Sequence, residues 1–277
     1  MLGQYLITLR EVLEAALITS IVLAYLSRTN RGHLSQYVWY GVVSAVLASI
    51  ILGISIWFAY GTLEESTQSL FEGIAALVAV AVLSSMIWWM AARGRELRSE
   101  IERQVEVITG SDATLGLIFF AFIVVFREGL ETVLFLTPFL VRDPVATVTG
   151  LFLGALTSLV LAYGIFAVGM KINVRRFFYF TSLLLVLLAG GLAGYGVHEI
   201  IEYTGPTQWG WLAQYAYDLN IPRDNPLHHE GAVGSILAAM FGYTVNPEWV
   251  RLLVHFSYLA IAVPLVVWIY RRTSKVS

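Results

Sequence analysis

Long apolar stretches separated by short polar segments run along almost the whole chain. A helix needs about 20 mostly apolar residues to cross a bilayer, and seven stretches reach that length. They cover residues 3–26, 37–60, 71–92, 114–140, 146–170, 177–197 and 251–270. We therefore predict an all-α integral membrane protein with seven transmembrane helices.

Two polar segments between these stretches are long enough to hold structure of their own. Residues 93–113 carry mixed charges and predict a solvated helical linker. Residues 198–250 contain one apolar run of about 13 residues, "GAVGSILAAMFGY" at 231–243. Because that run is too short to cross a bilayer, we expect a re-entrant or interfacial helix there.

The composition agrees with a membrane protein and excludes several other classes. Of 277 residues, 58% are hydrophobic and 13% are charged, whereas soluble domains have about 45–50% and about 25%. The chain has no cysteine, so it holds neither a disulfide nor a thiolate metal site. Its net charge of −2 offers no basic surface to nucleic acid. The N-terminus lacks the basic region of a secretory signal, and we assign it to the first span.

The distribution of Lys and Arg predicts the orientation, because basic residues concentrate in cytoplasmic loops. Twelve of them follow the odd-numbered spans, and three lie in the loops on the opposite side. The twelve are Arg28, Arg31, Arg93, Arg95, Arg98, Arg103, Lys171, Arg175, Arg176, Arg271, Arg272 and Lys275, and the three are Arg142, Arg223 and Arg251. The N-terminus is therefore expected outside and the C-terminus in the cytoplasm.

Two of the predicted spans carry charged residues in the same pattern, Arg-Glu-x-x-Glu. The pattern reads "REVLE" at 10–14 and "REGLE" at 127–131. Residues three or four apart share one face of a helix, so both glutamates of a copy point the same way and the arginine can pair with the second. Each charge at membrane depth costs about 2.5–3.5 kcal/mol, which internal ion pairs or a bound cation must offset. The residues are Arg10, Glu11 and Glu14, then Arg127, Glu128 and Glu131.

The two copies predict an inverted repeat. Three spans separate them, so they run in opposite directions, and the stretches that follow, 40–53 and 149–162, share Gly and Ser positions. Such transporters hold their substrate between the repeats. Four carboxylates facing each other would form an oxygen-only site, which Mg, Ca and Mn prefer and which by the same logic suits iron. A purely structural role, in which the ion pairs lock two helices together, is the alternative.

The expected organisation is a single membrane domain over residues 1–277. It consists of repeat one (1–92), a cytoplasmic linker (93–113), repeat two (114–197), an extracellular segment with a re-entrant helix (198–250) and a seventh span (251–277). The seventh span lies outside the 3+3 repeat.

With both motifs in this context, the chain resembles the iron permeases, a family comprising the fungal high-affinity iron permease and the bacterial EfeU-type ferrous iron permeases. The family hallmark is Arg-Glu-x-x-Glu in spans one and four, and the segments 71–90 and 234–259 also look like family segments. The resemblance implies a permease for iron (Fe2+ or Fe3+), not an enzyme, in the bacterial cytoplasmic membrane. It implies that iron is handled by Glu11, Glu14, Glu128 and Glu131, supported by Arg10 and Arg127.

The same resemblance bears on ligands and partners. Iron is expected as the transported substrate, with no permanently bound cofactor. A separate protein that oxidises iron, or a periplasmic protein that binds it, is the expected partner.

A second set of residues, predicted at the outer ends of spans three and six and in the segment outside, is a candidate site for collecting cations at the outer mouth. His198 and Glu202 lie one turn apart on one helical face; ordinary loop and capping roles are the alternative. The set comprises Glu72, His198, Glu199, Glu202, His228, His229 and Glu230. Met86, Trp88, Trp89 and Met90 are interpreted as an interfacial belt with packing roles; a methionine acting as a soft metal ligand is the alternative.

Other functions remain open on the residues alone. The same carboxylates could pass another divalent cation, such as Mn or Pb, or protons. A seven-span sensor is disfavoured by the repeat. A zinc protease is disfavoured because "HEIIE" at 198–202 has no second histidine.

Overall fold

The computed structural model describes the chain except residues 94–96, 110–112, 167–173, 230, 232 and 275–277. Its described part is a bundle of long helices without a β-strand, apart from one isolated bridge between Tyr215 and Glu248. The long helices are α1 (Leu2–Arg28), α2 (Ser35–Gly61), α3 (Glu65–Arg93), α5 (Ala113–Arg142), α6 (Pro144–Phe166), α7 (Val174–Thr204) and α9 (Trp249–Ser274). The shorter elements are η1 (Gly32–Leu34), α4 (Leu97–Thr109), η2 (Pro206–Ala213) and α8 (Gly234–Phe241).

Each apolar stretch predicted as a span lies on a long helix, except that 167–170, the end of the fifth stretch, are outside the described residues. The short apolar run contains α8. By length and apolar composition, five helices among the described residues qualify to cross a membrane: α2, α3, α6, α7 and α9. The helices α1 and α5 are 27 and 30 residues long and carry the charged motifs. The chain is therefore an all-α membrane protein.

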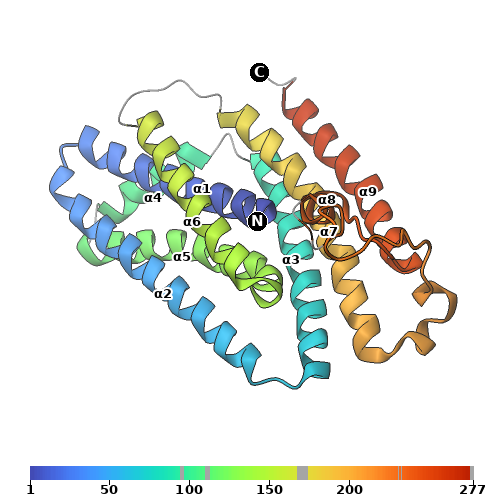
Figure 1. Ribbon diagram of the computed structural model, residues 1–277. Helices are drawn as coiled ribbons and strands as arrows, with labels where there is room; N and C mark the ends of the chain where they lie inside the picture. Colours follow the sequence, from blue (N-terminus) through green and yellow to red (C-terminus); the bar gives the residue numbers. More distant parts are fainter. Residues whose placement is uncertain (94–96, 110–112, 167–173, 230, 232, 275–277) are drawn as a thin grey trace.

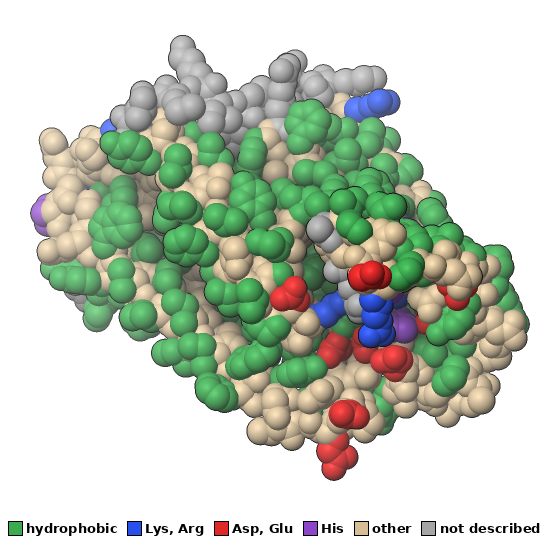
Figure 2. Space-filling view, in the orientation of Figure 1, with side chains coloured by type: hydrophobic (Ala, Val, Ile, Leu, Met, Phe, Trp, Pro, Cys, Tyr) green, Lys and Arg blue, Asp and Glu red, His purple; other side chains and the backbone are tan. Residues whose placement is uncertain are grey.

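Hydrophobic side chains cover most of the visible face (Figure 2). Ile51 and Phe58 of α2 and Phe152 of α6 are between 64% and 70% exposed, which suits contact with lipid tails rather than with water. Acidic and basic side chains gather near the end of the molecule where α2 meets α3 and α7 ends (Figure 2).

The helices that carry the motifs pack in two matched pairs, α1 along α6 and α5 along α2 (Figure 1). Both pairs meet at the shared glycine of the predicted repeat, where the partner backbone leaves no room for a Cβ atom. The residues that contact Gly41 lie 117 positions after the residues that contact Gly150, which is also the separation between the two motifs. Gly41 meets Ile118, Ala121 and Phe122, and Gly150 meets Met1, Gln4 and Tyr5.

The helices α3 and α7 form a third close contact, and α7 also packs on α9. A Cβ atom on Gly73 of α3 would lie 2.9 Å from the carbonyl oxygen of Gly196 on α7. Gly190 and Gly194 face His255 and Arg251 of α9, so the four-residue spacing of these small residues on α7 allows close helix approach. One buried apolar cluster joins α1, α3, α5, α7 and α9.

Only one face of the linker helix α4 is exposed, which corrects the prediction of a fully solvated linker. Ile101 and Val105 are 5% and 0% exposed, whereas Val107 is 72% exposed. The buried side chains belong to a second apolar cluster with residues of α1, α2 and α5. The mixed charges of the segment, such as the Arg103–Glu100 pair, lie on the exposed face.

Candidate metal centre

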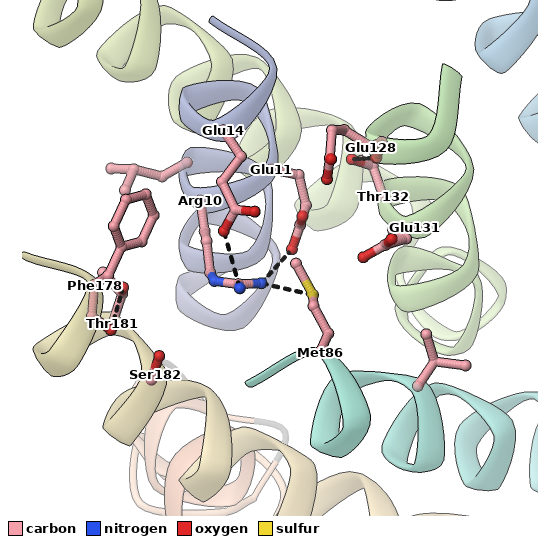
Figure 3. A network of polar contacts seen from close by, with 12 residues as sticks. Arg10, Glu11, Glu14, Met86, Glu128, Glu131, Thr132, Phe178, Thr181 and Ser182 are labelled. Carbon is pink, nitrogen blue, oxygen red and sulfur yellow. Dashed lines mark hydrogen bonds and ion pairs between the residues drawn. The ribbon is translucent and has the colours of Figure 1, made fainter. Parts of the chain in front are cut away.

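The first charged motif is buried in the middle of α1. Arg10 and Glu11 are 0% exposed and Glu14 is 6% exposed. The guanidinium of Arg10 donates from Nη1 to Glu11 Oε1 at 3.0 Å, and its Nη2 forms an ion pair with Glu14 Oε1 at 2.9 Å (Figure 3). The predicted i,i+4 pair is present. The second contact, to the neighbouring glutamate, was not predicted.

The second motif, on α5, repeats this arrangement in a looser form. Arg127 donates from Nη2 to Glu128 Oε1 at 2.6 Å, and its Nε lies 3.6 Å from Glu131 Oε1. Its side chain is 51% exposed. The two copies of the motif therefore differ: Arg10 is fully buried beside its carboxylates, whereas the side chain of Arg127 is half exposed.

Three of the four motif carboxylates come together between α1 and α5. Glu11, Glu128 and Glu131 each offer one oxygen, and these oxygens lie within 4.8 Å of one another. Glu14 is not part of this group, since its carboxylate turns toward Arg10 (Figure 3). The four-carboxylate site expected from the sequence is therefore a group of three in the structure, with the fourth held by an arginine.

Each carboxylate of this group keeps one oxygen that makes no hydrogen bond to a described residue. These atoms are Glu11 Oε2, Glu128 Oε2 and Glu131 Oε2, and all are buried. A buried charged oxygen without a partner is costly. Oxygen ligands from several carboxylates are the set that hard and borderline divalent cations take, so a cation bound among them would remove that cost.

Two side chains of α3 cover the arginines of both motifs. Arg10 Nη1 lies 2.8 Å from Met86 Sδ, and the Arg127 Cζ atom lies 5.9 Å from the centre of the Trp89 ring, within range of a cation–π contact. The sequence pattern alone assigns both to an interfacial belt. Their spacing of three residues, which places them on one helical face, was the available signal for a shared role.

Gly129 distinguishes "REGLE" from "REVLE", and packing explains it. A Cβ atom at this position would overlap Ser49 Oγ and lie 2.8 Å from Ser49 Cβ on α2. The glycine therefore allows α2 to approach α5 beside Glu128 and Glu131. Sequence reasoning assigned no role to this position.

A second group of possible metal ligands lies at the end of α7. His198, Glu199 and Glu202 offer ligand atoms within 4.8 Å of one another. Nδ1 of His198 also lies 2.8 Å from Oε1 of Glu248, a residue that immediately precedes α9. Burial alone would raise the pKa of Glu248, but the hydrogen bond and charge of His198 outweigh it and lower that pKa.

The other predicted outer residues have separate environments. Glu72 accepts hydrogen bonds from Tyr60, at 2.5 Å, and from Tyr195. The rings of His228 and His229 lie 4.1 Å apart and are tilted by 31° to each other, and neither residue belongs to the group on α7. Glu230 lies outside the described residues.

Comparisons with known proteins identify relatives along nearly the whole chain. The Iron permease FTR1 family matches residues 1–270. An uncharacterized protein of Archaeoglobus fulgidus is 42% identical over 276 residues, which is 99% of this chain and 98% of that protein. The ferrous iron permease EfeU of Yersinia pestis is 34% identical over 262 residues, covering 92% and 89% of the two chains. EfeU of an Escherichia coli strain is also 34% identical, over 92% and 91%. No solved structure matches the chain significantly.

Proposed function

Since the chain belongs to the Iron permease FTR1 family, we propose that it moves iron across the cytoplasmic membrane through the paired Arg-Glu-x-x-Glu carboxylates of α1 and α5. It acts as a permease and not as an enzyme. Iron is its substrate rather than a resident cofactor. The EfeU relatives are ferrous iron permeases by name, which favours Fe2+ as the species that reaches the site; carboxylates also accept Fe3+.

The observation that carries this proposal is the group formed by Glu11, Glu128 and Glu131. Their oxygens come within 4.8 Å of one another, and each residue keeps a buried oxygen without a hydrogen-bond donor among the described residues. Buried polar groups are normally satisfied, so three such oxygens converging in one place favour a bound cation over a purely structural ion-pair network. We assign these three carboxylates to iron binding during passage.

The remaining motif residues complete the proposed site. Glu14 takes the ion as it leaves the group of three, because it is the next carboxylate along the same face of α1. Arg10 and Arg127 hold the carboxylates in place and balance part of their charge when no ion is bound. Four carboxylates and two guanidinium groups leave a net negative site, which attracts a cation.

The topology that goes with this function has seven spans, with α1 and α5 crossing the membrane beside the five more apolar helices. The ends of α3, α6 and α9 lie at one end of the bundle with the start of α7, and the α2–α3 turn and the end of α7 lie at the other (Figure 1). With the basic residues placed in the cytoplasm, the N-terminus is outside and the C-terminus inside.

We further propose that residues 1–92 and 114–197 form an inverted repeat, linked by residues 93–113. The matched glycine contacts of α2 with α5 and of α6 with α1 support it. Residues 198–250, with α8 as the re-entrant helix, lie outside, and residues 251–277 add the seventh span. All of them form one membrane domain.

At the outer mouth, we propose that His198, Glu199 and Glu202 collect cations before passage. Glu72 lies on the same side, and the histidine pair before α8 extends the set. A periplasmic iron-binding or iron-oxidising protein is the proposed partner that delivers the ion to this side.

Uptake of radioactive iron into proteoliposomes tests the proposal. Glutamine keeps the shape of glutamate and removes its charge, so we expect a Glu128→Gln/Glu131→Gln variant to lose at least about 10-fold in uptake. Glu64→Gln, at the exposed turn before α3, is the matched control and should transport like the wild type. Normal uptake by the double variant would make the glutamates structural. Uptake of manganese in preference to iron would favour the alternative substrate.

A further inference from the structure

The contact between Met86 and the first motif is chemically unusual. Nη1 of Arg10 lies between two acceptors, 3.0 Å from Glu11 Oε1 and 2.8 Å from Met86 Sδ. A thioether is a weak hydrogen-bond acceptor, yet here it receives a buried guanidinium while a buried oxygen of the same Glu11 has no hydrogen bond to a described residue.

Resting on the proposed function, we propose that the Met86 thioether is a ligand of the transported iron and makes the site prefer iron to harder divalent cations. In the structure, the Nη1 group of Arg10 is a tethered positive charge held by one carboxylate oxygen and one sulfur. A metal cation binds the same two kinds of atom. Entry of iron therefore replaces Nη1 between Glu11 and Met86.

The surroundings allow that replacement without leaving Arg10 uncompensated. Its other terminal nitrogen, Nη2, faces Glu14 Oε1 at 2.9 Å, and this pair stays in place when Nη1 moves. Glu11 belongs both to the contacts of Arg10 and to the group with Glu128 and Glu131. Met86 lies at the end of the Arg10 guanidinium that also faces Glu11, and Glu131 lies beyond them on α5 (Figure 3).

The ligand set then explains selectivity. Carboxylate oxygens alone suit Mg2+, Ca2+ and Mn2+, whereas thioether sulfur favours softer ions. Fe2+ is softer than Mg2+ or Ca2+, and a given N/O/S ligand set binds Fe2+ more tightly than Mn2+. Three carboxylates supply the charge that attracts any divalent cation. One sulfur atom supplies the difference between iron and manganese.

The competing explanation is packing, since Met86 also contacts the apolar cluster formed by α1, α3, α5, α7 and α9. Under that explanation, a side chain of similar volume would serve equally well. Leucine is such a side chain, and cores generally tolerate exchanges between methionine and leucine. Met86→Leu therefore removes the sulfur and keeps most of the packing.

X-ray absorption at the iron edge tests the ligand directly. The chain has no cysteine, so any sulfur neighbour of bound iron must come from a methionine. Purified protein loaded with Fe2+ without oxygen should show a sulfur neighbour in the wild type and none in Met86→Leu. The matched control is Met90→Leu, one turn along α3 at a buried position, which should keep the signal.

The outcomes separate this inference from the proposed function. Iron bound with only oxygen and nitrogen neighbours in the wild type would overturn the role of Met86 and leave the iron site standing. Absence of bound iron in the wild type would contradict both.

Transport gives a second readout in proteoliposomes. We expect the ratio of Fe2+ uptake to Mn2+ uptake to fall about 10-fold in Met86→Leu, the lower range for losing a group that tunes a metal site. Met90→Leu should keep the wild-type ratio. An unchanged ratio in Met86→Leu would assign Met86 to packing.

Discussion

Replacing Gly129 by alanine adds a single methyl group, and the structure predicts that it damages both stability and transport. The new Cβ atom would overlap Ser49 Oγ and lie 2.8 Å from Ser49 Cβ. Neither atom can move away freely, because Ser49 is buried and its Oγ donates to the carbonyl oxygen of Ala45 at 2.9 Å. The strain therefore falls on the contact between α2 and α5.

Two opposing effects set the magnitude. Replacing glycine by alanine at a compatible position stabilises a protein by about 0.4–1 kcal/mol, because the unfolded chain loses freedom. Forcing an extra methyl group into a packed contact costs about 1–3 kcal/mol. The clash is larger, so we expect Gly129→Ala to lower the free energy of unfolding by about 1–2 kcal/mol. Iron uptake should fall as well, since Glu128 and Glu131 flank the displaced residue.

Thermal unfolding of the purified protein in detergent, with iron uptake in proteoliposomes, measures both effects. Gly53→Ala on α2 is the matched control. Its new methyl group would have its nearest neighbour, Val133 Cγ2, at 3.6 Å, which is ordinary contact. This variant should unfold at or above the wild-type temperature. Ser49→Gly should rescue Gly129→Ala, whereas Ser49→Ala should rescue it only in part because the serine Cβ remains.

A Gly129→Ala protein as stable as the wild type would refute this account. So would failure of Ser49→Gly to restore stability, because the second change removes the whole clash.

Three other predictions concern charge and burial. Arg10→Lys should reduce iron uptake more than Arg127→Lys. Lysine is a point charge that cannot hold two carboxylates as a guanidinium fork does, and this loss matters less at Arg127, whose side chain is already 51% exposed. Equal losses of uptake in the two variants would contradict this. Glu248→Gln should lower the unfolding temperature above pH 4.5, the ordinary pKa of that carboxyl. Burial alone would raise the pKa of Glu248, but the hydrogen bond and charge of His198 outweigh burial and lower the pKa overall. The difference from the wild type should disappear as the pH falls through the lowered pKa, and a difference that grows on acidification would reverse the sign. Val105→Asp should destabilise the protein strongly and Val107→Asp hardly at all in the same melt, because these positions are 0% and 72% exposed; similar effects would place α4 away from the bundle.

Apolar periodicity and length were enough to predict the long helices, since a membrane helix must satisfy its own backbone and reads as one continuous apolar stretch. The short helix α8 was predicted for the same reason. Spacing within a helix also predicted the pairs of Arg10 with Glu14 and of Arg127 with Glu131. These are local features, set by residues close together in the chain.

Contacts between helices could not be read in the same way. Met86 and Trp89 meet the arginines across separations of 76 and 38 residues. Their spacing puts both on one face of α3, but it does not show that this face turns toward α1 and α5. The exclusion of Glu14 from the carboxylate group depends on the rotamer of Arg10. The burial of one face of α4 depends on the cluster that receives it. In each case, the deciding partner lies on another helix.

The crossed pairing of the matched helices has a consequence for how such a chain could have arisen. The first helix of each proposed repeat packs against the second helix of the other repeat, with α1 on α6 and α5 on α2. A half-length ancestor would therefore have exposed both contact surfaces when alone. It would have needed a second copy inserted in the opposite direction, so assembly of antiparallel partners would have preceded the fusion that joined them in one chain.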